Sequence, residues 1–168
     1  MMAQAHPKLA LRPYLAADAA LLREIFRASI EALTTDDYSE AQREAWASAA
    51  DDEAAFGKDL GSQLTLVATL AGSPVGFASL ASGNRIEMLY VHPAAAGQGV
   101  GAVLIDALEK LAGSRGAALL SVDASDSARG FFEKRGYVAQ QRNSVLVGGE
   151  WLANTTLHKQ LAAKREAS

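Results

Sequence analysis

The glycine-rich segment at 97–102 is the feature that most constrains how this sequence can fold. It reads Gly-Gln-Gly-Val-Gly-Ala and lies between a β-rich run, 85–92, and a helical pattern, 100–112. Backbone N–H groups at a helix start lack partners and carry partial positive charge, so glycines there let an anion approach the bare backbone. The segment therefore predicts either a phosphate-binding turn or a tight loop in which the glycines serve backbone geometry alone.

Two other phosphate-binding motifs compete for this segment. A Walker loop requires Gly-Lys-Ser/Thr at its end, which the sequence lacks. Gly97, Gly99 and Ala102 fit a dinucleotide-binding fingerprint, and Asp123 follows at about the distance of a ribose-binding carboxylate. In that fold the glycines follow the strand directly, whereas residues 92–96 intervene here, and too little chain remains for a substrate domain. The sequence therefore argues against a dinucleotide binder.

The hydrophobic pattern predicts an alternation of strands and helices along the whole chain. A strand is expected over 9–14, and a helix begins after Asp18 as N-cap. That helix carries one apolar stripe: Leu22, Ile25, Phe26, Ile30 and Leu33. The segment 34–61 predicts one or two short helices, including the run 40–47 capped by residues 36–39.

The second half of the chain predicts a meander followed by two helices and three strands. A hairpin is expected over 63–81 around the turn 71–73, and a third strand over 85–92. The helix 100–112 should bury Val103, Leu104, Leu108 and Leu111 and close at Gly113 and Gly116. Further elements are a strand at 117–122, a helix at 127–134, and two strands within 137–161 that turn at Gly148-Gly149.

Composition narrows the classes of partner. The chain has 168 residues, so we expect a single domain over 1–168. A net charge of −3 argues against binding to nucleic acid or to an anionic membrane. The absence of cysteine excludes disulfides, thiolate metal ligands and a cysteine nucleophile, and His6, His92 and His158 show no metal-ligand spacing. Residues 1–8 do not resemble a signal peptide, and no apolar run is long enough to span a bilayer, so we expect a cytoplasmic protein without a metal.

Two linked motifs resemble those of the GNAT superfamily of N-acetyltransferases. Residues 89–93 followed by 96–101 resemble its acetyl-CoA signature, usually written Q/R-x-x-G-x-G/A. A second signature, N-x-x-A-x-x-F-Y followed by lysine and glycine, is echoed by Ser125, Ala128, Phe131, Phe132, Lys134, Gly136 and Tyr137. The region of residues 37–39 and Trp46 resembles the YafP-like branch of that superfamily.

The resemblance implies both a fold and an activity. The fold would be α/β (α+β), with a mixed, mostly antiparallel sheet of about seven strands flanked by about four helices. The activity would be transfer of an acetyl group from acetyl-CoA to a small-molecule or peptidyl amine, by direct attack in a ternary complex. The exposed edge strands of such a sheet make a homodimer an expectation.

By the same resemblance, cofactor-binding residues fall on both motifs. They are Leu89, Tyr90, Val91, Ala96, Gly97, Gln98, Gly99, Val100, Gly101, Ala102, Ser125, Ala128, Arg129, Phe132 and Lys134. Three positions depart from the family pattern: Ala96 replaces Gln or Arg, Ser125 replaces Asn, and Phe132 replaces the tyrosine that many members use as general acid. Backbone amides near Leu89 and Val91, at a bulge in the strand, would face the thioester carbonyl and the pantetheine.

The catalytic residues are less constrained by the motifs. Glu87 matches the position of a carboxylate base in the family, although alternation along the strand also allows a solvent-facing residue. Either Tyr38 or Tyr90 replaces the missing acid, or the enzyme is slow. Tyr38 and Trp46 would form part of the acceptor wall, where core packing is the alternative for Trp46. The losses at Phe132 and Ala96 leave open a catalytically impaired, acyl-CoA-binding regulatory module.

Overall fold

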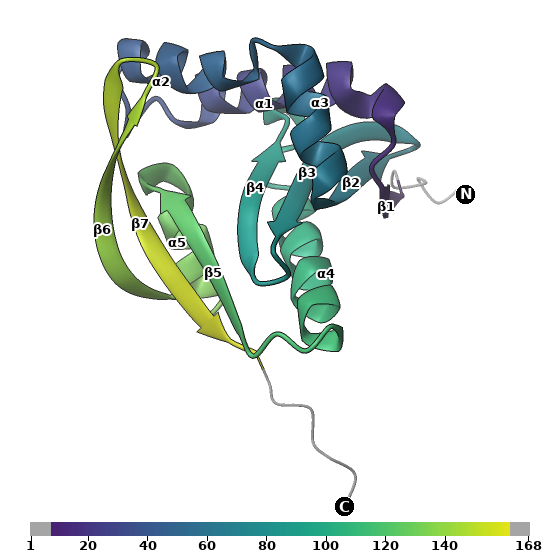
Figure 1. Cartoon of the computed structure of the whole chain (residues 1–168). Coiled ribbons are helices and arrows are strands. Elements are labelled where there is room, and N and C mark those ends of the chain that lie inside the picture. Colours follow the sequence, from purple (N-terminus) through teal and green to yellow (C-terminus); the bar gives the residue numbers. More distant parts are fainter. Residues whose placement is uncertain (1–7, 162–168) are drawn as a thin grey trace, which may run out of the picture.

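The computed structural model describes residues 8–161 and places seven strands and five α-helices around one sheet (Figure 1). The strands are β1 (Leu9–Pro13), β2 (Leu64–Leu70), β3 (Ser73–Ala81), β4 (Arg85–Val91), β5 (Leu119–Ser125), β6 (Val138–Val147) and β7 (Glu150–Gln160). The helices are α1 (Ala19–Leu33), α2 (Glu40–Ala47), α3 (Glu53–Ser62), α4 (Val100–Ser114) and α5 (Asp126–Lys134). His6 and the two ends of the domain predicted over 1–168 lie outside the described residues.

The sheet has the order β1-β2-β3-β4-β5-β7-β6, and only the β4–β5 pair is parallel. The predicted mixed, mostly antiparallel sheet of seven strands is confirmed, with five α-helices in the described part rather than about four. A dinucleotide-binding fold requires a mainly parallel sheet, so this topology excludes that alternative. The outer strand β6 is mostly exposed, and a homodimer along such an edge stays a prediction.

Helices cover both faces of the sheet. On one face, α1 and α3 bury Phe26 and Phe56 against Val67 and Phe77 of β2 and β3. On the other face lies a larger core that α4 and α5 share with the sheet, and a side chain as fully buried as Leu104 contributes about 1.5–3 kcal/mol. No helix in the described part of the chain is both long and apolar enough to cross a membrane.

Gly76 of β3 sets how closely α4 approaches the sheet. A Cβ at this glycine would lie 3.0 Å from Val100 Cγ1 and 3.1 Å from the Tyr90 carbonyl oxygen. These separations are tighter than most real contacts, so the absence of a side chain lets the first turn of α4 rest directly on the strand. The glycine-rich turn before α4 is thereby held beside β4.

Several details of the predicted helices are corrected. Asp18 stands at the start of α1 but caps no helical N–H group: its carboxylate accepts from the Leu15 amide at 2.8 Å and pairs with Arg12 at 2.7 Å. Leu33 and Val103 are exposed rather than buried, since each lies at the margin of its apolar stripe. The helix α4 also runs through Gly113 and ends at Ser114, because Gly113 keeps a helical backbone and faces the Leu161 side chain instead of turning.

Candidate active site

The parallel strands β4 and β5 separate soon after they begin. Their pairing covers Arg85–Ser121 and Ile86–Val122, and beyond it no further β4–β5 pair occurs in residues 8–161. A cavity of about 470 Å³ occupies this opening. Its wall comes from β4, the glycine-rich turn, β5 and the start of α5, with α1 closing the opposite side. Figure 1 shows β4 and β5 lying apart, and the cavity lies in the opening between them.

A bulge in β4 directs its backbone toward this cleft. Ser79 of β3 pairs with Met88 and Leu80 pairs with Ile86, so Glu87 is the extra residue on β4. Beyond the bulge, the His92 amide donates to the Val75 carbonyl at 2.8 Å. Because hydrogen bonding alternates along an antiparallel pair, the amides of Leu89 and Val91 point away from β3 and toward the opening. The expected bulge and the expected direction of these two amides are thus features of the fold.

The glycine-rich turn leaves its backbone open at the other end of the cavity. Gly97 and Gly99 have φ values of +78° and +81°, a left-handed conformation that side chains other than glycine rarely adopt. A Cβ at either position would meet no atom within 4 Å, so open space lies over the first turn of α4. Unpaired amides at the N-terminus of a 15-residue helix attract anions. This chemistry fits the diphosphate of a coenzyme A thioester.

Most of the predicted cofactor residues line the cavity, and three do not. Those that line it are Leu89, Tyr90, Val91, Ala96, Gly97, Gly99, Val100, Gly101, Ala102, Ser125, Ala128 and Phe132. The remaining three, Gln98, Arg129 and Lys134, lie outside the lining. Arg129 pairs with Glu133 at 3.0 Å, and Lys134 is exposed at the end of α5. The roles of these residues in binding a cofactor stay predictions.

Ser125 and Phe132 shape the α5 side of the cavity. The Ser125 hydroxyl accepts a hydrogen bond from the Ala128 amide at 3.1 Å and so caps α5. Phe132 is 1% exposed and packs edge to face on Phe131 and Tyr137, with ring centroids 5.2 and 5.1 Å apart. Phe132 therefore contributes an apolar surface where a tyrosine would contribute a hydroxyl.

Glu87 lies on the cavity wall and is partly solvated. Its carboxylate pairs with Arg85 at 2.8 Å, and its side chain is 37% exposed. Glu87 thus reaches water and also belongs to the cavity wall, and its role as a base stays a prediction. A carboxylate at the bulge can accept a proton directly or through one water molecule.

Tyr90 and Trp46 form the aromatic part of the wall. Trp46 Nε1 donates to the Tyr90 hydroxyl at 3.2 Å, and the Tyr90 ring lies 4.5 Å from Phe26 and 5.7 Å from Phe77, centroid to centroid. Burial raises the pKa of Tyr90 to about 12, although the hydrogen bond from Trp46 opposes this shift. Trp46 both packs on the α1 core and lines the cavity, and its role in the acceptor wall stays a prediction.

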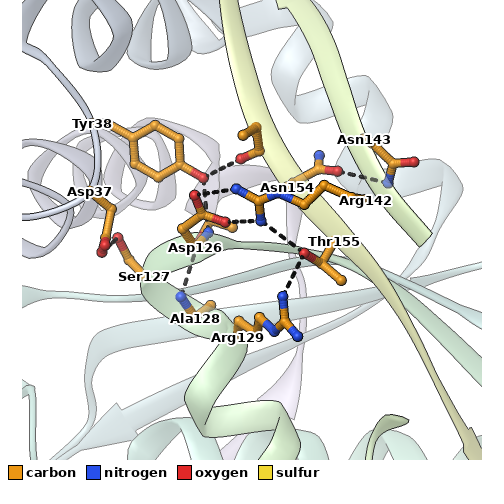
Figure 2. A network of polar contacts seen from close by, with 12 residues as sticks. Asp37, Tyr38, Asp126, Ser127, Ala128, Arg129, Arg142, Asn143, Asn154 and Thr155 are labelled. Carbon is orange, nitrogen blue, oxygen red and sulfur yellow. Dashed lines mark hydrogen bonds and ion pairs between the residues drawn. The ribbon is translucent and has the colours of Figure 1, made fainter. Parts of the chain in front are cut away.

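Tyr38 occupies a different place from Tyr90. Its ring is 5% exposed and lies outside the cavity lining. The hydroxyl donates to the Ala153 carbonyl of β7 at 2.5 Å and accepts from the Asp126 amide at 2.9 Å, as Figure 2 shows. Arg142 joins this network by pairing with Asp126. The geometry favours a structural role for Tyr38, which fastens the segment before α2 to β7 and α5.

Replacing Tyr38 by phenylalanine is expected to lower the free energy of unfolding by about 1–3 kcal/mol, because it leaves a buried carbonyl and amide without their partner. Urea unfolding of the variant measures this loss. Tyr14→Phe is the matched control, since the Tyr14 hydroxyl makes only a 3.4 Å contact to the Gly57 carbonyl. Unchanged stability together with a fall in kcat would contradict the structural role and support Tyr38 as an acid.

Sequence reasoning did not place four polar residues on the cavity wall. Ser29 and Thr34 reach it from α1 and the residue that follows α1, Asp123 reaches it from β5, and Ser127 reaches it from α5. A signal for Asp123 was present, because Leu120, Val122 and Ala124 are buried on one face of β5 and Asp123 must then point to the other. No comparable signal marked Ser29, which falls within an apolar helical stripe.

The two described histidines lie far from each other in the sequence, one in the turn after β4 and one on β7. His92 Nδ1 accepts from the Ala94 amide at 3.0 Å and so fixes the turn that leads from β4 to the glycines. His158 lies on β7, paired with Ser121 of β5. Within residues 8–161, no three His, Cys, Asp or Glu side chains are grouped as metal ligands.

Comparison with known proteins assigns the chain to a family. Residues 34–153, more than half of the chain, match the model of the acetyltransferase (GNAT) domain. The uncharacterized N-acetyltransferase YafP of Escherichia coli is 32% identical over 144 residues, which cover 86% of this chain and 91% of YafP. The chain therefore belongs to the GNAT family and is an N-acetyltransferase of the acyltransferase class. The similarity to YafP agrees with the branch that the sequence resembled.

Solved structures of the family have the same fold. A crystal structure of a GCN5-related N-acetyltransferase from Rhodopseudomonas palustris is 65% identical, covers 96% of this chain and 99% of that chain, and gives a TM-score of 0.90. The PaiA N-acetyltransferase of Thermoplasma acidophilum, solved in complex with coenzyme A, is 18% identical, with coverage of 91% and 99% and a TM-score of 0.75. At 18% identity, the second structure supports the fold alone.

Proposed function

We propose that this protein transfers an acetyl group from acetyl-CoA to a primary amine by direct attack within a ternary complex. The observation that carries the proposal is the opening between β4 and β5, with the open glycine turn at one end and Glu87 at the bulge of β4. The match of residues 34–153 to the acetyltransferase (GNAT) domain supports acetyl-CoA as the co-substrate here. Acetyl-CoA supplies an acyl group activated as a thioester.

Each group of residues has a role that follows from its position along the cleft. The amides around Gly97 and Gly99 bind the diphosphate at the start of α4. The Leu89 and Val91 amides hold the pantetheine arm and donate to the carbonyl oxygen, where negative charge develops as the amine nitrogen bonds to carbon. Glu87 accepts the proton that the amine releases, directly or through water, and the carbon–sulfur bond breaks to release coenzyme A as thiolate.

We assign the Tyr90 hydroxyl as the group that donates a hydrogen bond to the departing thiolate. Its pKa of about 12 keeps it protonated at neutral pH. Complete proton transfer to a thiolate whose thiol has a pKa near about 8.5 is unfavourable, so Tyr90 acts as a hydrogen-bond donor and solvent supplies the proton.

Replacing Tyr90 by phenylalanine is expected to lower kcat by about tenfold, the cost of one hydrogen bond to a charged group.

The same variant should also change how the free energy of unfolding depends on pH. Because the pKa of folded Tyr90 is about 12 and that of an unfolded tyrosine is about 10, the wild-type free energy of unfolding falls as pH rises through this window. Tyr90→Phe should lose less stability between these pH values. An identical alkaline decline in both proteins would contradict the burial of the Tyr90 hydroxyl.

The appearance of free thiol tests the proposed activity. Purified protein is incubated with acetyl-CoA and a broad panel of amines, and thiol release above the rate without amine is the expected result. No release with any amine would contradict acetyl transfer to amines.

A second candidate function is an acyl-CoA-binding regulatory module with impaired catalysis. It is favoured by the apolar Phe132, by Ala96 and by the pairing of Glu87 with Arg85. Tight binding of coenzyme A combined with acetylation that does not depend on Glu87 would support this alternative.

A further inference from the structure

The charged side chains on the cavity wall all have the same sign. Glu87 and Asp123 are carboxylates, and no Arg, Lys or His of residues 8–161 belongs to the lining. The open amides of the glycine turn supply partial positive charge only at the far end, where the diphosphate is expected. The acceptor end of the cavity is therefore acidic, and it attracts cations and repels anions.

Glu87 and Asp123 hold equivalent positions on β4 and β5, where the strands begin to separate. The last parallel pair is Ile86–Val122, and the next residue on each strand is a carboxylate. Glu87 is paired with Arg85 at 2.8 Å, whereas no ion pair of the described residues involves Asp123. Among the described residues, Asp123 is thus the wall carboxylate whose charge is not offset by a basic side chain.

Hydrogen bonds from the neighbouring strands hold Asp123 in place. Its Oδ1 accepts from the Thr156 hydroxyl at 2.5 Å. The Thr156 hydroxyl in turn accepts a hydrogen bond from the side-chain amide of Asn143 at 2.8 Å. The same side-chain amide donates to Oδ1 of Asn154 at 2.9 Å. This chain crosses from β5 through β7 to β6. A carboxylate oriented in this way interacts with a ligand at low entropic cost.

Apolar side chains line much of the cavity beside the carboxylates. Ile30 and Leu33 of α1 face the cavity together with Trp46 of α2 and Met88 of β4. Leu33 is 43% exposed although it belongs to this wall, so bound apolar surface would cover it. The cavity therefore combines negative charge with apolar surface.

We propose that the acceptor is a primary amine with an apolar body and no carboxylate, and that Asp123 selects it by charge. The assignment rests on the proposed acetyl transfer and names the acceptor class of that reaction. Asp123 attracts the ammonium form as the ligand enters, and Glu87 then takes the proton. The α-carboxylate of a free amino acid would face Asp123 without a basic partner, so amino acids are rejected.

Phenethylamine and phenylalanine form a matched pair of probes, because they differ only by the carboxylate. Calorimetry on protein saturated with coenzyme A measures the binding of each, and thiol release from acetyl-CoA measures kcat/KM. We expect phenethylamine to bind at least about tenfold more tightly and to show the higher kcat/KM. Basicity predicts the opposite order of reactivity, since phenylalanine has the lower amine pKa and more free amine at neutral pH.

The variant Asp123→Asn should reduce this preference to about threefold or less through the binding of the amine, with the KM for acetyl-CoA unchanged. Asp59→Asn is the matched control, because Asp59 is an exposed carboxylate of α3 outside the cavity lining, and it should keep the full preference. A preference that persists in Asp123→Asn would overturn the assignment.

The two measurements separate this assignment from the proposed reaction. Selective binding of phenethylamine without thiol release supports charge selection by Asp123 and contradicts acetyl transfer. Thiol release with phenylalanine as readily as with phenethylamine overturns the selection and leaves acetyl transfer standing. Failure of wild-type protein to bind either probe also overturns the assignment.

Discussion

Replacing Glu87 by glutamine is expected to lower kcat by about 100-fold, because a general base contributes at least this factor to proton transfer. The glutamine keeps the shape of the side chain and its place at the bulge of β4 but cannot accept the proton of the amine. The KM for acetyl-CoA should change little, since the glycine turn and the Leu89 and Val91 amides are untouched. Initial rates of thiol release across acetyl-CoA concentrations measure both parameters.

Glu133→Gln is the matched control for this prediction. Glu133 also pairs with an arginine, at 3.0 Å, and is 47% exposed, but it lies on α5 outside the cavity lining. Its kcat should remain within about twofold of wild type, because loss of an exposed ion pair costs little. Equal kcat values for wild type and Glu87→Gln would contradict the role of Glu87 and favour the regulatory module.

The double variant Gly97→Ala with Gly99→Ala is expected to weaken coenzyme A binding by about 100-fold. Each added Cβ would stand in the open space above the amides that we assign to the diphosphate. Each substitution also places alanine at a positive φ, which costs about 1–2 kcal/mol of stability per residue. Calorimetric titration with coenzyme A measures the loss of affinity on the folded protein.

A matched control separates the effect of backbone strain at positive φ from the loss of contact with the diphosphate. Gly72 in the β2–β3 turn and Gly149 in the β6–β7 turn both have a φ of +85°, and a Cβ at either would also meet no atom within 4 Å. The double variant Gly72→Ala with Gly149→Ala should therefore lose similar stability and keep its affinity for coenzyme A. Equal losses of affinity in the two double variants would show that the glycine turn acts only through backbone strain.

Local sequence signals predicted much of this fold. The cap of α2 is a clear case, since Ser39 accepts from the Gln42 amide and Gln42 from the Ser39 amide, as the spacing of a capping box requires. The β2–β3 hairpin formed where predicted, because Ala71 and Gly72 adopt the positive φ values of a two-residue turn. These signals lie within a few residues of one another and do not depend on the rest of the chain.

The features that sequence reasoning missed depend on distant contacts. Tyr38 precedes α2, yet its hydroxyl bonds to Ala153, which follows 115 residues later. Asp18 is a local exception, because it has the position of a helix cap but its carboxylate binds Arg12, which lies only six residues before it. The divergence of β4 from β5 has no local signal, because no local pattern states where two distant strands stop pairing. Residue order alone could not place Asp123 and Glu87 on the same cavity wall.

Calorimetric titration of the purified wild-type protein with coenzyme A tests the central claim most directly. The cleft between β4 and β5, with the bare amides of the glycine turn, predicts saturable binding at one site per chain, displaced by acetyl-CoA and unaffected by NAD. Absence of saturable binding, or binding that NAD displaces as well as acetyl-CoA does, would contradict it.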